Sequence, residues 1–387
     1  MTIHLAYDLR FIVKAWCKMQ TMVMPPCLTC NMHTPPPRIE WIDIAKALGI
    51  ILVSFGHIRN GDGESVWLPA LDSTIDAIYL FHMPLFFILG GLTFSAKRPF
   101  RQFLVRKIRT LLIPYYFFSL YFLAKPIAIL AIPSLASTFQ TDHNYDLAHQ
   151  FYDVLIDGNG LWFLMAFFVA EIMTYGIVKV IASSSAHVTL GIILIIGTYF
   201  WTSYEMPDHL PFQILKGIQI TGFFLVIHAL RNSILTISKR TAAFAVAPSL
   251  VLLVVCHLLL IQLKHWNAAT WFNVPFTIAG AFAGSIAVAA ISMVIGHSMS
   301  LSKIGKDSLV YYALNALTLN IVKLLIFRIL GIDATSFSFA IQLLTGCIIT
   351  ILSLMLLSIE NAIIQRWFWW MIGKQNTRPA FGSSNKD

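Results

Sequence analysis

Charged residues are scarce in this chain. Only 12% of the 387 residues are Asp, Glu, Lys or Arg, whereas 57% are hydrophobic. A soluble domain usually carries about a quarter charged residues. The few charges present cannot cover a water-facing surface, so the composition excludes a water-soluble globular domain and indicates that lipid is the solvent.

Cysteine is also scarce, and its spacing gives no disulfide framework. The five cysteines are Cys17, Cys27, Cys30, Cys256 and Cys347. Cys27 and Cys30 form a CxxC, but a single CxxC is a weak indication of a metal or redox site. We therefore expect ordinary reduced thiols and no metal ion.

The N-terminal segment lacks the uncharged apolar core of a signal peptide. Four charged residues interrupt its apolar stretch, and three consecutive prolines at its end would break any helix. We interpret residues 1–37 as a cytoplasmic tail, with a surface-lying amphipathic segment as the alternative. The membrane domain then covers residues 38–362, and residues 363–387 form a second cytoplasmic tail.

Long apolar runs, by contrast, are abundant. A helix that spans a membrane needs about 20 mostly apolar residues. We therefore expect an all-α polytopic integral membrane protein with about ten transmembrane helices, the fifth of which is short. The predicted spans are 41–58, 74–96, 108–132, 161–182, 187–203, 212–230, 241–262, 272–296, 308–330 and 338–360.

Basic residues alternate along the connecting segments. Most of the 27 Lys and Arg residues lie before the first span or after an even-numbered span, whereas the other connections hold only Arg59, Lys264 and Arg328. The positive-inside rule then places both termini in the cytoplasm. Because the basic excess belongs to loops, the net charge of +9 does not imply a nucleic-acid partner.

The first two predicted spans carry ionisable residues. Lys46 and His57 are eleven residues apart, which puts them on one face of a helix and about 16 Å apart. Asp43 lies one turn before Lys46, close enough to pair with it. His82 lies in the second span beside Pro84. Two histidines in the outer halves of antiparallel spans favour a shared polar site, where a histidine can act as a general base; structural or interfacial roles are the alternative.

A dense basic run, Lys97 to Arg109, follows the second span and precedes Tyr115. Orientation of the chain alone could account for it, but its density exceeds what topology requires. Arginine forms forked contacts with phosphate. Arg101, Arg106 and Arg109 are therefore candidates to hold the phosphates of a cytoplasmic cofactor.

The pattern as a whole resembles the acyltransferase 3 family of membrane O-acyltransferases. It looks closest to the branch of fucose 4-O-acetylase-like and polysaccharide O-acetyltransferases. Lys46 and His57 match the family signature of a basic residue, ten intervening residues and a histidine. Asn315 departs from the family, which often has a histidine there, and asparagine cannot act as a base. The resemblance rests on Arg38–Lys46, Gly56–His57, Phe81–Gly91, Arg106–Arg109, Leu112–Tyr115, Trp162–Leu164 and Gly305–Tyr312.

The resemblance implies a multi-pass enzyme of the bacterial inner membrane. Such an enzyme moves an acetyl group from cytoplasmic acetyl-CoA, its cosubstrate, to a hydroxyl of a cell-surface glycan such as lipopolysaccharide O-antigen or exopolysaccharide, or of its lipid-linked precursor. Direct transfer and an acyl-histidine intermediate both stay open. The alternative function is a secondary transporter or flippase for a sugar or small metabolite. The expected roles are catalysis by His57, His82 and Asp43, donor binding by Lys46, Arg101, Arg106, Arg109 and Tyr115, and acceptor binding by Trp162 and Asn315.

The predicted topology places the loop 133–160 outside. A cysteine that replaces Asn144 should therefore react with a membrane-impermeant thiol reagent in cells whose outer barrier is open, and one that replaces Arg98 should be protected. The parent chain gives the background labelling. Labelling at position 98 without labelling at position 144 would invert the topology.

Overall fold

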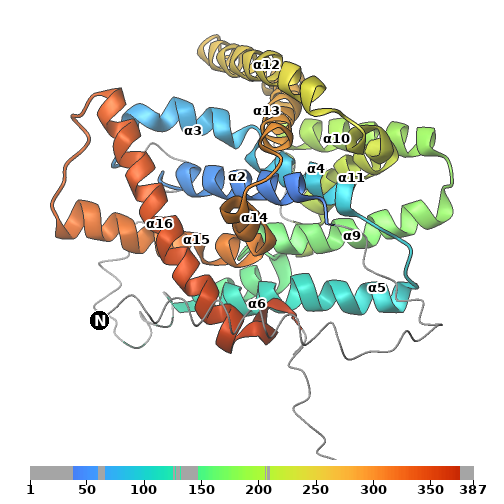
Figure 1. The fold of residues 1–387 in the computed structure, drawn as a ribbon, viewed down its shortest axis with the longest axis horizontal. Coiled ribbons are helices and arrows are strands. Elements are labelled where there is room, and N and C mark those ends of the chain that lie inside the picture. The colour runs from blue at the N-terminus through green and yellow to red at the C-terminus, as the bar shows by residue number, and fades with distance from the viewer. Residues whose placement is uncertain are drawn as a thin grey trace, which may run out of the picture. The chain divides into compact units, whose positions relative to one another are not determined.

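The computed structural model describes residues 38–59, 66–124, 147–204 and 210–374, with positions 127, 131 and 206 in addition. Every regular element within these ranges is a helix, and they contain no strand (Figure 1). The predicted N-terminal tail with its CxxC and the last residues, 375–387, lie outside the described residues.

Within the described ranges, most helices follow one another along the chain with short connections. The longer ones are α2 (Glu40–Gly56), α3 (Asp72–Tyr79), α4 (His82–Thr93), α5 (Phe100–Lys107), α6 (Ile113–Ser119), α8 (Leu147–Tyr152), α9 (Trp162–Val180), α10 (Ser184–Ser203), α11 (Ile214–Leu235), α12 (Lys239–His265), α13 (Asn273–Ile295), α14 (Met299–Lys306), α15 (Ser308–Lys323) and α16 (Phe339–Trp367). Short 3₁₀ or π turns extend several of them, among them η2 (Ile108–Leu112), η5 (Asp153–Asp157), η8 (Leu324–Ile329) and η9 (Trp369–Ile372).

Eight helical segments of the described chain are long and apolar enough to cross a membrane. They correspond to eight of the ten predicted spans. The helix at the first predicted span, α2, has 17 residues, and part of the third, 108–132, lies outside the described residues. The all-helical, multi-span fold is confirmed, while the count of about ten and the orientation stay predictions. The eight segments are Pro69–Thr93, Leu147–Val180, Ser184–Ser203, Pro211–Leu235, Lys239–His265, Thr270–Ile295, Ser308–Ile329 and Phe339–Trp367.

Helix α2 lies among many of the other helices (Figure 1). It packs against α4, α13, α14, α15 and α16, and most of its residues are buried. Its 17 residues correspond to a length of about 25 Å. Because α2 is surrounded by protein, the polar side chains at its two ends face other helices rather than lipid.

A close contact with α14 fixes the N-terminal end of α2. A Cβ added to Gly305 of α14 would stand 1.8 Å from the carbonyl oxygen of Asp43. Nearby, Glu40 accepts hydrogen bonds from the ring of His297 at 2.8 Å and from the hydroxyl of Ser302 at 2.9 Å. These bonds, with that of His297 the stronger cause, lower the pKa of Glu40. The start of α2 is thus held by both backbone packing and hydrogen bonds.

Small residues bring α10 and α11 together. A Cβ on Gly191 would lie 2.7 Å from the Gly222 carbonyl oxygen, and a Cβ on Gly222 would lie 2.8 Å from that of Gly191. Helices in membranes associate where small residues let backbones approach, since lipid provides little hydrophobic drive between helices. The short fifth predicted span, 187–203, is therefore a true helix with a tightly packed partner.

Helix α12 has the opposite character. It packs mainly on α13, and apolar side chains such as Phe244, Val251 and Leu258 are exposed along it. A long helix that is apolar all round is either buried in protein or faces lipid. Because α12 is not covered by the described chain, its exposed side chains belong against lipid.

The second predicted span, 74–96, is broken into α3 and α4. The break lies at Leu80 and Phe81, and Phe81 has non-helical backbone angles. Pro84 accounts for this position, since a proline lacks the N–H and clashes with the carbonyl four residues earlier, that of Leu80. The break makes His82 the first residue of α4.

The predicted outer loop is not irregular throughout. Its second part folds into α8 and η5, ahead of α9. Val154 of η5 is buried, and its carbonyl accepts a hydrogen bond from the Tyr115 hydroxyl. The acidic residues Asp153 and Asp157 of η5 thus accompany an apolar residue that packs. Asp142 and Asp146 of the same predicted loop lie outside the described residues.

The residues just beyond 362, predicted to begin the C-terminal tail, are helical. Helix α16 continues to Trp367, and η9 follows it. Ile372 of η9 is buried in the cluster around Tyr115, and Trp370 contacts Phe117 with ring centroids 4.8 Å apart. Aromatic residues after the apolar run therefore extend the folded domain into the predicted tail.

The contact at Gly305 gives a stability prediction. The variant Gly305→Ala should be destabilised by about 3 kcal/mol, because its Cβ overlaps backbone that cannot move away as a side chain can. Gly176→Ala is the control, since a Cβ there meets nothing within 4 Å and should change stability by less than about 1 kcal/mol. Thermal unfolding of the purified proteins, followed by size-exclusion fluorescence, measures both. Equal midpoints for Gly305→Ala and the parent would contradict the close approach.

Candidate functional site

His57 lies immediately after the last residue of α2. Its ring Nδ1 lies 2.8 Å from the carbonyl oxygen of Val53. Because a carbonyl only accepts, Nδ1 must carry the proton and donate. In the neutral ring, Nε2 is then the unprotonated nitrogen, which can take a proton from another group.

His82 has the same arrangement on the neighbouring helix. Its Nδ1 donates to the carbonyl oxygen of Ile78 at 3.1 Å, across the break between α3 and α4. The rings of His57 and His82 are nearly perpendicular, with centroids 6.4 Å apart. The structure thus brings together the two histidines that the sequence predicted to share a site, and gives both the same tautomer.

Tyr79 completes this cluster, which we call the histidine site (His57, Tyr79, His82). Its hydroxyl donates to the Gly56 carbonyl oxygen at 3.0 Å, and its ring centroid lies 6.1 Å from that of His57 and 4.9 Å from that of His82. Sequence reasoning missed Tyr79. Its spacing of three residues before His82, one helical turn, was the available signal.

Positive charges surround the histidine site. The buried Lys323 of α15 donates to the carbonyl oxygens of His57 and Ile58, each at 3.4 Å. Arg59 donates to Asp76 at 2.7 Å and lies over the ring of Tyr79. The sequence analysis gave Lys323 no role. Its contact with the end of α2 joins residues distant in sequence, so no local pattern could reveal it.

Asn315 contacts α2 one turn before His57, and no hydrogen bond among the described residues joins it to the histidine site. Its Oδ1 accepts a hydrogen bond from the Ser54 hydroxyl at 2.6 Å, and both side chains are buried. Ser54 precedes His57 by three residues on α2. The predicted contact of Asn315 with the acceptor stays a prediction, and its observed role is to tie α15 to α2.

A second polar region lies at the other end of α2. Lys46 lines an internal cavity of 260 Å³, which we call the central cavity. It is bounded by α2, α4, α9, α15 and the α5–η2 segment. Along α4 its lining residues extend from Met83 to Thr93, a rise of about 15 Å. The cavity therefore runs from Lys46 to the residue next to His82.

Lys107 and Glu171 form an ion pair on the wall of the central cavity. The Lys107 ammonium group donates to Oε1 of Glu171. Glu171 is only 4% exposed, and its Oε2 has no hydrogen-bond partner among the described residues. The sequence analysis treated Lys107 as one more cation of the basic run and missed its buried partner, 64 residues later.

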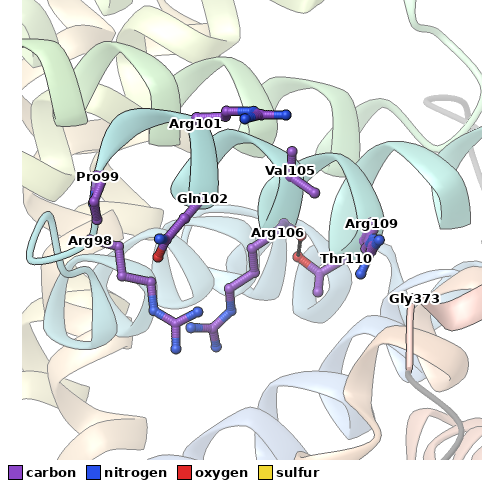
Figure 2. A pocket seen from close by; sticks show the side chains of 9 residues that line it. All are labelled: Arg98, Pro99, Arg101, Gln102, Val105, Arg106, Arg109, Thr110 and Gly373. Carbon is purple, nitrogen blue, oxygen red and sulfur yellow. Dashed lines mark hydrogen bonds between the residues drawn. The ribbon is translucent and has the colours of Figure 1, made fainter.

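The predicted donor-binding arginines lie together in a larger pocket of 790 Å³, which we call the arginine pocket. None of its lining residues is acidic. Figure 2 shows Arg98 and Arg106 extending to the same side of α5 and Arg109 beside Gly373. The pocket is lined by Arg98, Pro99, Arg101, Gln102, Val105, Arg106, Arg109, Thr110 and Gly373.

The arginine pocket and the central cavity lie on different faces of one helical segment. Arg106 and Thr110 line the pocket, whereas Lys107 and Leu111 line the cavity. Successive residues of a helix point about 100° apart. The structure therefore brings Arg101, Arg106 and Arg109 together but gives Lys46, predicted to share their ligand, a separate space.

The remaining predicted residues have other surroundings. Asp43 is buried beside Gly305, fourteen residues from His57 or about 21 Å along α2, so it does not reach the histidine site. Tyr115 is fully buried, donates to Val154 and lines neither space. Trp162 begins α9, with the Lys216 ammonium group 4.4 Å from its ring centroid.

Comparison with known proteins identifies the family of the chain. A family model described as an acyltransferase domain, that of the acyltransferase 3 family, matches residues 39–359. No curated protein and no solved structure matches the chain. The match covers both ends of α2, the broken span with His82 and the walls of the central cavity. The chain therefore belongs to the acyltransferase 3 family and is a membrane acyltransferase.

Proposed function

We propose that this acyltransferase moves an acetyl group from cytoplasmic acetyl-CoA to a hydroxyl of a cell-surface glycan or of its lipid-linked precursor, in the bacterial inner membrane. The observation that carries the proposal is the histidine site at one end of α2, with the central cavity beside Lys46 toward the other end and the arginine pocket on another face of the α5–η2 segment. A donor from the cytoplasm and an acceptor from outside can then meet within one buried helix bundle.

His57 is the proposed general base. Its Nε2 takes the proton of the acceptor hydroxyl while the hydroxyl oxygen attacks the thioester carbonyl carbon. The new C–O bond forms as the C–S bond breaks, and the proton on Nε2 passes to the leaving thiolate of CoA. His82 and Tyr79 orient the ring of His57 and the acceptor, and such positioning lowers the entropic cost of the reaction.

Lys323 supplies positive charge at the same place. Its ammonium group donates to the carbonyl oxygens of His57 and Ile58. In this role it fixes the turn that carries His57. It also favours the negative charge that develops on the thioester oxygen, because fixed charges act strongly where water is excluded.

The arginine pocket is the proposed site of the phosphate groups of CoA. Four arginines line it without an acidic residue, and a polyphosphate is the ligand that such a set binds best. Its place in the basic run of the predicted cytoplasmic side agrees with a cytoplasmic donor. Release of free CoA thiol from acetyl-CoA by purified protein, dependent on a glycan acceptor, separates this function from a transporter or flippase.

The variant His57→Ala should lower the rate of transfer by about 10² to 10⁴, the usual contribution of a general base. Acetyl-CoA binding should be unchanged, because the base acts on the acceptor. His257→Ala is the control, since that histidine lies on α12 and bonds to Ser73 outside the histidine site. Single-turnover rates on monodisperse protein measure the effect. A near-normal rate for His57→Ala across pH 6–9 would assign the base to another group.

The variants Arg106→Ala and Arg109→Ala should each raise the KM for acetyl-CoA about fivefold, with kcat little changed. This corresponds to about 1 kcal/mol for an exposed charge-assisted contact, so the effect should shrink at high salt. Arg240→Ala is the matched control, because Arg240 lies at the start of α12 and outside the arginine pocket. An increase in the KM for the acceptor with an unchanged KM for acetyl-CoA would remove these arginines from donor binding.

A further inference from the structure

The central cavity contains a buried carboxylate that is only half satisfied. Oε1 of Glu171 accepts from Lys107, while Oε2 is buried and has no partner within the described chain. A buried polar atom without a hydrogen bond is costly, and more so when it is charged. Glu171 lines the cavity, so a molecule in the cavity can supply the missing donor.

The rest of the lining limits what that molecule can be. The walls include Phe86, Phe163 and Phe167, with Lys46 near one end and Met83 at the other. At 260 Å³ the cavity is below the usual size of sites for whole small molecules, about 300–1,000 Å³. The lining extends about 15 Å along α4 and is largely aromatic and apolar, so the cavity suits a slender chain with apolar segments.

The charges restrict the ligand further. Glu171 would repel a phosphate brought next to its free oxygen, and its own charge is already paired with Lys107. A neutral N–H group satisfies Oε2 without adding a charge to the cavity. The ligand class that combines neutral N–H groups, carbonyl oxygens and methylene segments in a narrow chain is a secondary amide.

We propose that the central cavity binds the amide-bearing pantetheine arm of the acyl donor, with Oε2 of Glu171 accepting a hydrogen bond from an amide N–H. This inference rests on the proposed function, which makes acetyl-CoA the donor. Lys107 holds the carboxylate in place, and the cavity carries the arm along α4 as far as Met83, in the first turn of the helix that begins at His82. The arginine pocket lies on another face of the α5–η2 segment. The donor therefore bends around this segment at the point where the phosphates of the donor join its pantetheine arm.

The test uses S-acetylpantetheine, which has the amides of the donor but neither the nucleotide nor its phosphates. Purified full-length protein in lipid nanodiscs binds radiolabelled acetyl-CoA, and S-acetylpantetheine competes for it. Glu171→Gln should weaken both ligands about tenfold, the effect of altering one hydrogen bond to a charged group. Arg106→Ala should weaken acetyl-CoA and leave S-acetylpantetheine unchanged.

Thr174→Val is the matched control for Glu171. Thr174 lies one turn further along α9, is fully buried, and also has a side-chain oxygen without a partner among the described residues, but it does not line the cavity. This variant should bind both ligands as the parent does. If Glu171→Gln is not monodisperse, Glu171→Asp takes its place, since it keeps the charge beside Lys107 and withdraws the carboxylate by one methylene; it should also weaken both ligands.

The outcomes separate this inference from the proposed function. If the parent protein binds acetyl-CoA and the Glu171 variants bind both ligands as tightly as the parent does, the arm site is overturned and the proposed function stands. Parent protein that binds neither ligand would overturn both. Equal losses in Glu171→Gln and Thr174→Val would show a general packing defect and would also overturn the arm site.

Discussion

Polar groups inside a membrane must find their partners within the protein, because lipid offers no hydrogen bonds. Around α2 this constraint is met in three ways. The rings of His57 and His82 donate to carbonyl groups one turn back on their own chain. Lys323 covers the carbonyls left open where α2 ends. Glu171 and Lys107 satisfy each other in part. The bonds of the two histidine rings leave each Nε2 unprotonated in the neutral ring, and the Lys107–Glu171 pair leaves Oε2 of Glu171 as an acceptor in the central cavity.

Much of the fold followed from the sequence, because a membrane span has a strong and local signal. Eight predicted spans correspond to helices of sufficient length and apolarity. The boundaries were less accurate where the chain mixes signals. The predicted outer loop contains helical turns around Val154, and the predicted C-terminal tail contains Trp370 and Ile372, which pack on the membrane domain. Charge indicates the side of the membrane, but side-chain packing decides where a helix stops.

The candidate site was predictable only where its members lie on adjacent helices. The pairing of His57 with His82 followed from the expectation that consecutive spans run antiparallel, which brings the end of the first next to the start of the second. Tyr79 could have been predicted in the same way, because it lies one helical turn before His82. Lys323 and Glu171 were not, since their partners lie 266 and 64 residues away. The separation of the arginine pocket from Lys46 also needed the structure, because composition says that a segment is basic but not which face of the helix meets a cavity.

The break in the second span has a consequence for how the chain enters the membrane. Helices α3 and α4 have eight and twelve residues, roughly 12 and 18 Å long, and neither alone crosses a hydrocarbon layer of about 30 Å. Other helices must therefore surround the break, and α13 is one of them: the Phe81 carbonyl oxygen accepts from the Leu85 N–H at 2.9 Å and also from the Ser285 hydroxyl of α13 at 3.4 Å. During synthesis α13 emerges about two hundred residues after the break. The packing around the histidine site is therefore completed late in biogenesis, and a truncated chain that inserts its first spans still lacks the helix against which Leu80 and Phe81, just before His82, pack.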